Sequence, residues 1–151
     1  MKFKQFLVRI TTALVLFAGI ASASDYSTIA VAVGGYDLVS YQQSGGPKSG
    51  NGHNLVNHEG NIYAFTNAKN KSTFETNPEK YLPAFGGFCA YGASVGKKFY
   101  GDPSVYKVVD GTLYLNLDKK VQSIWNKDIS GNISEANKLW ASIKYVPAAE
   151  L

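Results

Sequence analysis

The chain has 151 residues, 45% of them hydrophobic and 17% charged, and a formal net charge of +4. Ten tyrosines, eight phenylalanines and two tryptophans supply enough apolar area for the core of one domain, so disulfide bonds are not needed to stabilise it. No stretch of interleaved lysine and arginine follows residue 23. The basic surface expected of a nucleic-acid-binding protein is therefore missing, and no nucleic-acid partner is predicted.

The first 23 residues are typical of a signal peptide. Lys2, Lys4 and Arg9 precede the apolar run 13–20, which is too short to span a bilayer, and Ala21-Ser22-Ala23 has the A-x-A pattern of a cleavage site. We expect cleavage after Ala23 and a periplasmic or secreted chain with no membrane span. The leader carries three of the 15 basic residues and none of the 11 acidic ones, so the net charge falls to +1.

The next segments predict a hairpin and a helix. Residues 24–34 form a lead-in, and strands at 54–58 and 61–66 flank the turn pair Glu59-Gly60. Thr66 or Asn67 can cap a helix that carries Phe74 inward and ends near residues 77–78. A short turn then runs to Pro83.

A second hairpin and two helices are predicted after a glycine-rich segment around Cys89. Strands at 105–109 and 112–117 flank Asp110-Gly111, the strongest hairpin signal of the chain. Apolar residues at helical spacing then predict two helices, separated by Gly131, the second capped by Asn132 with Glu135. No repeated segment is recognised.

These elements predict one α+β domain, with antiparallel β-hairpins, a central helix and a C-terminal helical pair packed over a compact antiparallel sheet. The domain is expected at residues 35–143, followed by a loose tail at 144–151.

Five segments in order resemble the exported proteins of the YHS-domain family: 35–41, 63–65, 74–81, 86–91 and 109–116. The resemblance covers residues 35–143 and implies binding of a soft metal, copper above all. In the YHS domains of copper-transporting ATPases, cysteines occupy three positions that correspond here to Ser40, Thr66 and Asn70. None of these is a soft ligand, so the resemblance implies no thiolate site at those positions. Leu38 also replaces the usual proline.

A metal site would have to be built from other residues. Copper and zinc prefer thiolate and imidazole ligands, and the exported chain offers Cys89, His53 and His58, with Asp37, Glu59 and Asp102 as carboxylates. Soft-metal handling through Cys89 is therefore the leading functional hypothesis, with copper or zinc as the cofactor.

Cys89 is the single cysteine, so it has no intramolecular disulfide partner. Three alternatives remain open for it: a buried core thiol, a partner for a thiol of another molecule, or a nucleophile activated by an imidazole. No local catalytic motif supports an enzyme.

The second functional hypothesis is a metal-free module that binds a small ligand or a protein, with Cys89 as a core thiol. Aromatic rings with convergent hydroxyl groups are typical of small-ligand sites. Tyr36, Asp37, Tyr41 and Tyr91 are the candidates for such a pocket.

Overall fold

The computed structural model describes residues 30–151, so the predicted signal peptide and cleavage site lie outside the described residues. The strands are β1 (Asn51–His58), β2 (Asn61–Phe65), β3 (Asp102–Val109) and β4 (Thr112–Asn116), and the α-helices are α1 (Ala68–Thr76), α2 (Ala90–Ser94), α3 (Lys119–Trp125) and α4 (Ile129–Ile143). The fold class is α+β, as predicted. The two hairpins do not join into the single sheet expected, because each forms its own two-stranded antiparallel sheet.

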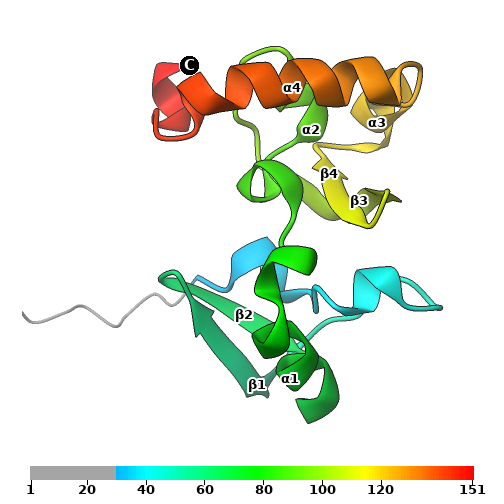
Figure 1. Cartoon of the computed structure of the whole chain (residues 1–151), viewed down its shortest axis with the longest axis vertical. Coiled ribbons are helices and arrows are strands. Elements are labelled where there is room, and N and C mark those ends of the chain that lie inside the picture. Colours follow the sequence, from blue (N-terminus) through cyan, green and yellow to red (C-terminus); the bar gives the residue numbers. More distant parts are fainter. Residues whose placement is uncertain (1–29) are drawn as a thin grey trace, which may run out of the picture.

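The part of the chain from residue 31 to residue 125 is built from two copies of one arrangement. In both copies a 3-10 turn (Ala32–Gly35, Ala84–Gly87) leads to a hairpin, and the hairpin leads to a helix, α1 or α3. We call residues 31–76 the first repeat and residues 83–125 the second repeat. Figure 1 shows the first repeat below and the second above.

The two hairpins have the same strand register, because adding 51 to the residue numbers of each pair in the first repeat gives a pair in the second. Leu55 pairs with Ala64 in the first repeat and Tyr106 with Leu115 in the second, and both ladders are irregular at the same place. Both hairpin turns are left-handed at two successive residues, with φ of 50° and 80° at Glu59-Gly60 and 49° and 78° at Asp110-Gly111. Positive φ at both central residues is what a tight type I′ hairpin needs.

The 3-10 turns match as well. Val33 and Phe85 are left-handed, with φ of 52° and 55°, and two left-handed glycines follow each of them. A left-handed β-branched residue such as Val33 is strained, and strain of this kind persists only where surrounding contacts impose it. One such contact is shared, since Asp37 and Cys89, four residues after Val33 and Phe85, donate their backbone N–H to the carbonyls of Lys48 and Phe99.

The prediction that the chain contains no repeat was therefore wrong. Equivalent positions share the glycines of the turns and one buried tyrosine, Tyr63 in the first repeat and Tyr114 in the second. Most other core side chains differ; Phe74 corresponds to Trp125, and both are fully buried. The two repeats share their backbone conformation and the positions of their buried residues. Different amino acids can meet both conditions, so the repeats have few identical residues.

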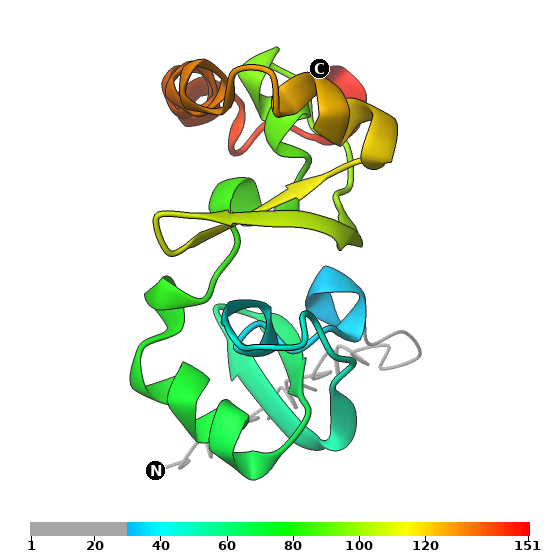
Figure 2. The same cartoon turned by 90° about the vertical axis from the view of Figure 1, so that its right-hand side faces the viewer.

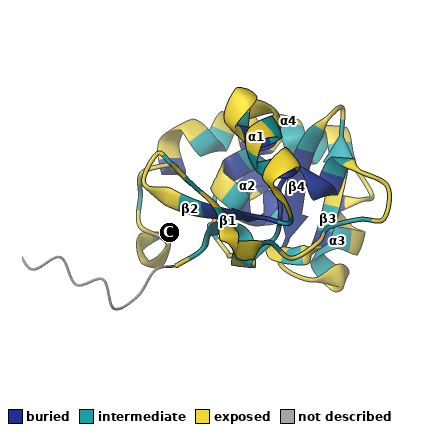
Figure 3. Ribbon diagram, turned by 90° about the horizontal axis from the view of Figure 1, so that it is seen from below, coloured by how far each residue is buried: buried dark blue, intermediate teal, exposed yellow. Residues whose placement is uncertain are grey.

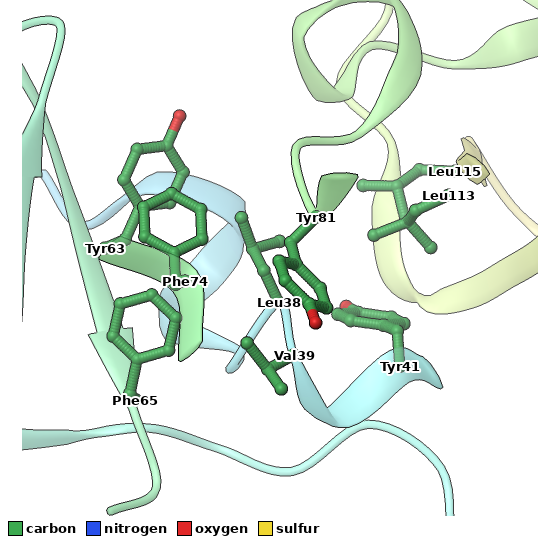
Figure 4. Packing of buried hydrophobic residues seen from close by; sticks show 9 residues of the cluster. All are labelled: Leu38, Val39, Tyr41, Tyr63, Phe65, Phe74, Tyr81, Leu113 and Leu115. Atoms are coloured by element: carbon green, nitrogen blue, oxygen red, sulfur yellow. The ribbon is translucent and has the colours of Figure 1, made fainter. Parts of the chain in front are cut away.

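The two repeats stack through the β3-β4 sheet. Leu113 and Leu115 point from β4 toward the first repeat, where they join a buried cluster that includes Leu38, Tyr41 and Tyr81 (Figure 4). Tyr114, between them, points to the opposite face.

That opposite face is covered by helices. Tyr114 packs there with Trp125 of α3, Ala93 of α2 and Ala136 of α4. Figure 2 shows the resulting order of layers, with the β3-β4 sheet between the first repeat and the C-terminal helices. Buried residues concentrate on β2, β4 and α2 (Figure 3).

The C-terminal helical pair is present, but its break lies before Gly131. α3 ends at Trp125, and Asp128 caps α4 by accepting the N–H of Gly131 on its carboxylate. Gly131 lies inside α4, where a Cβ would overlap the Asp128 carboxylate. Asn132 is also helical and does not cap, because its amide donates to the carbonyls of Trp125 and Asp128.

Within residues 30–151, none of the helices combines the length and apolar character needed to cross a bilayer.

Candidate functional site

Asp37 is the centre of a buried polar network in the first repeat. Its side chain is fully buried, and its carboxylate accepts the backbone N–H of Val39 at 2.9 Å and that of Thr66 at 2.9 Å. The Asn70 side-chain amide donates to the same group at 2.7 Å, and the Ser40 N–H at 3.3 Å. No lysine or arginine lies within ion-pair distance of this carboxylate, since the one ion pair of residues 30–151 joins Lys138 and Glu135. The carboxylate is held by dipolar donors alone.

This network joins segments that are far apart in the sequence. Ser40, Thr66 and Asn70 all donate hydrogen bonds to the Asp37 carboxylate. The carboxylate therefore ties the segment after the first 3-10 turn to the end of β2 and to α1. Because each contact to the carboxylate is a donated hydrogen bond, its lone pairs are used within the protein.

Cys89 occupies the position of Asp37 in the second repeat. The thiol is 1% exposed, its sulfur accepts the Gly92 N–H at 3.4 Å, and it lies 3.8 Å from Oδ1 of Asn116. Asn116 stands where the first repeat has Phe65; it is fully buried, and its Nδ2 has no hydrogen-bond partner among the described residues. A thiol with this burial behaves as a small core residue.

The two histidines lie on the first hairpin and not beside Cys89. His53 is exposed on β1, and His58 packs edge-on against Phe74 with ring centroids 5.7 Å apart. β1 belongs to the first repeat, whereas Cys89 precedes α2 in the second (Figure 1). Among residues 30–151 no three His, Cys, Asp or Glu side chains are grouped as a metal ion would require. The neighbours of Cys89 thus do not fit a copper or zinc site.

The tyrosines named as pocket candidates pack into the protein. Tyr41 is buried, stacks edge-on against Tyr106 at 4.9 Å, and donates its hydroxyl to the Pro103 carbonyl at 2.8 Å. Burial raises the pKa of Tyr41 well above its usual value, and the neighbouring phenols and Asp102 raise it further. Tyr36 lies against Tyr41, and Tyr91 packs on the helical cluster of the second repeat.

A groove of about 840 Å³ lies between the repeats, and none of the four pocket candidates lines it. Both strained turns line it, through Val33 and Gly34 of the first repeat and Gly86 and Gly87 of the second. The two turns lie close together, because a Cβ added to Gly87 would come within 3.9 Å of a Val33 methyl group. The groove therefore exists only where the two repeats meet.

One end of the groove is aromatic and basic. Phe88 stacks on Tyr100 with centroids 5.6 Å apart, and Trp140 of α4 lies 6.1 Å from Phe88. The Lys98 ammonium lies 4.9 Å from the centroid of the Phe88 ring, and Lys144 lines the same end.

The other end is acidic. Glu59 and Glu79 line it together with Asn61 and the Tyr63 ring. The pKa of Tyr63 is raised, first by burial and then by these two carboxylates. A ligand in the groove would meet apolar and ring surfaces along its length, with opposite charges at the two ends.

The sequence contained one signal for this site that was not used. The segment Ala-x-Gly-Gly occurs at residues 32–35 and again at 84–87, and these are the two turns that line the groove. Trp140 and Lys144 gave no such signal, because only the packing of α4 brings them to the groove.

Comparison with family models, with curated proteins and with solved structures found no match to this chain.

Proposed function

We propose that this chain is an exported YHS-type protein that binds a small organic ligand in the groove between its repeats, with no metal ion at Cys89. The observation that carries the proposal is that both strained turns line one groove. Left-handed conformations at Val33 and Phe85 are costly, and strain of this kind clusters at ligand sites. Gly34 after Val33, and Gly86 and Gly87 after Phe85, leave backbone uncovered beside the groove.

The groove wall indicates the ligand's character. Phe88, Tyr100 and Trp140 offer ring faces to an apolar or aromatic body, and Lys144 offers a cation to an acidic substituent. Metal handling is not favoured, because Cys89 is closed off by Gly92 and Asn116 and has no imidazole partner beside it.

Binding of the fluorescent probe 8-anilinonaphthalene-1-sulfonate, an aromatic anion, tests the groove. The chain produced from Ser24 should bind it saturably at one site. Trp140→Ala should weaken binding roughly three- to tenfold, the range expected for loss of one aromatic contact. Ile124→Ala is the matched control, because Ile124 is a partly exposed apolar residue of α3 outside the groove and should change nothing. Non-saturable binding, or equal affinity in Trp140→Ala, would refute the groove as a ligand site.

The proposal that no metal ion binds at Cys89 is tested separately. Competition with a chromogenic chelator for Cu(I) and Zn(II) should give the same result for the reduced protein and for Cys89→Ser. A one-to-one site that disappears in Cys89→Ser would restore the metal hypothesis.

A further inference from the structure

The most exposed aromatic residues of residues 30–151 gather at one corner of the molecule. Tyr145 is 86% exposed, Tyr100 83% and Phe99 48%. Phe99 and Tyr100 follow Lys97 and Lys98 in the segment between α2 and β3, and Tyr145 follows Lys144 directly after α4. We call Lys97–Tyr100 together with Lys144 and Tyr145 the basic aromatic corner.

Hydrogen bonds hold the two segments of this corner together. The Lys98 ammonium donates to the carbonyl of Val146 at 2.7 Å and to that of Lys144 at 3.2 Å. The same ammonium lies over the Trp140 ring, 5.8 Å from its centroid. Both views of the ribbon place the end of α4 beside the segment that follows α2 (Figures 1 and 2). The corner is therefore a built surface whose parts are fixed to each other.

The charge of the corner has one sign. Residues 84–101 contain two lysines and no acidic residue, and residues 136–149 contain Lys138 and Lys144 and no acidic residue. The nearest acidic residues along the chain are Asp102, Glu135 and Glu150, and Glu135 is paired with Lys138. Since residues 24–151 have a net charge of only +1, the positive charge here is a local property of the corner.

We propose that the basic aromatic corner docks the protein on an anionic phospholipid surface. Tyrosine and phenylalanine side chains insert at the level of lipid headgroups, where a ring meets acyl chains and a hydroxyl meets water. Lysines beside them are attracted to anionic headgroups, each by about fivefold in affinity. A soluble polyanion would bind the lysines but would not bury the three exposed rings. The rings therefore favour a bilayer over a soluble polyanion as the partner. Tyr100 and Lys144 also line the groove, whereas Lys97, Phe99 and Tyr145 do not, so these three residues test the docking separately from ligand binding.

Co-sedimentation with vesicles tests the proposal, using the chain produced from Ser24 because the apolar leader would itself bind lipid. All the contacts that build the corner lie within residues 30–151, so this chain retains them. It should bind vesicles of phosphatidylcholine mixed with phosphatidylglycerol and should not bind vesicles of phosphatidylcholine alone. Binding should weaken strongly between about 0.05 M and about 0.5 M salt, because the screening length shortens.

Variants locate the surface. Lys97→Gln with Lys144→Gln should lower the affinity about 30-fold, and Tyr145→Ser should lower it without changing the net charge. Lys119→Gln with Lys120→Gln is the matched control, since these exposed lysines of α3 carry the same charge and lie outside the corner. No binding to the mixed vesicles, or equal loss in the control, would overturn the proposal. Binding to soluble dextran sulfate that Tyr145→Ser leaves unchanged, with no vesicle binding, would make the corner a polyanion site and would also overturn it.

Discussion

Removal of the Asp37 carboxylate should disrupt the polar network of the first repeat. Cys89, at the equivalent position of the second repeat, provides an internal comparison. In Asp37→Ala, the N–H groups of Val39 and Thr66 and the amide of Asn70 lose an acceptor. Water cannot replace it readily, because Asp37 is fully buried and Asn70 is 5% exposed.

The size of the effect follows from these contacts. A hydrogen bond to a charged group contributes about 1.5–3 kcal/mol, and a buried donor left without a partner costs about 1–3 kcal/mol. Three such bonds do not add fully, because burying the carboxylate itself has a desolvation cost that the variant removes. The expected loss in the free energy of unfolding is therefore about 3–5 kcal/mol, a large share of the total stability of a small domain.

Urea unfolding followed by tryptophan fluorescence provides the measurement. Cys89→Ala, at the equivalent position, removes two weak contacts of the sulfur, with the Gly92 N–H and with Oδ1 of Asn116, and a small volume; it should cost only about 1 kcal/mol. Asn70→Ala and the double variant with Asp37→Ala complete a cycle, in which a coupling of at least about 1 kcal/mol is expected. A loss below about 1 kcal/mol in Asp37→Ala would show that the network does not hold the first repeat together.

Other parts of the fold give further predictions. Phe74→Ala and Trp125→Ala remove equivalent buried rings and should each cost about 3–5 kcal/mol in urea unfolding; a much smaller cost for one would contradict their equivalence. Gly101→Ala should cost more than about 1 kcal/mol, because the new Cβ would lie 2.8 Å from the Gly87 carbonyl oxygen, whereas Gly52→Ala, with open space around it, should not destabilise the protein; similar midpoints would count against this packing. Because the pKa of Tyr41 is raised, the unfolded chain loses its phenolic proton first, so the stability contributed by Tyr41 is complete below about pH 10 and falls as the pH rises further. The stability difference between the protein and Tyr41→Phe should therefore shrink between about pH 8 and about pH 11, and an unchanged difference would refute the linkage. Asp128→Ala should cost about 1 kcal/mol through loss of the α4 cap and should lower helix content by circular dichroism, which an unaltered thermal midpoint would disprove.

The local elements of this fold were predictable because each depends on neighbouring residues. Glu59-Gly60 and Asp110-Gly111 form the expected hairpin turns, and Asn67, one of the two caps predicted for α1, accepts the Asn70 N–H on its side chain. The error at the C-terminal helices arose because Gly131 was interpreted as a break. Its backbone N–H instead completes the Asp128 cap, a role that resembles a break in the sequence alone.

The candidate site depends on packing between distant segments. Residues 31–34, 86–88 and Trp140 line one groove because the repeats stack through Leu113 and Leu115, and no local pattern specifies that contact. The resemblance drew attention to Ser40, Thr66 and Asn70, but their convergence on Asp37 required the hairpin to fold back onto residues 37–40.

The sequence alone was enough to predict the two hairpin turns and the cap of α1, because glycine, asparagine and aspartate act on the backbone within a few residues. It also determined that the chain contains one thiol. Three features became visible in the folded chain and not before: the two halves repeat, Cys89 is enclosed beside Asn116, and the groove lies between the repeats. Burial and long-range contacts depend on which elements pack together, and this packing involves all the core side chains together and no single local segment.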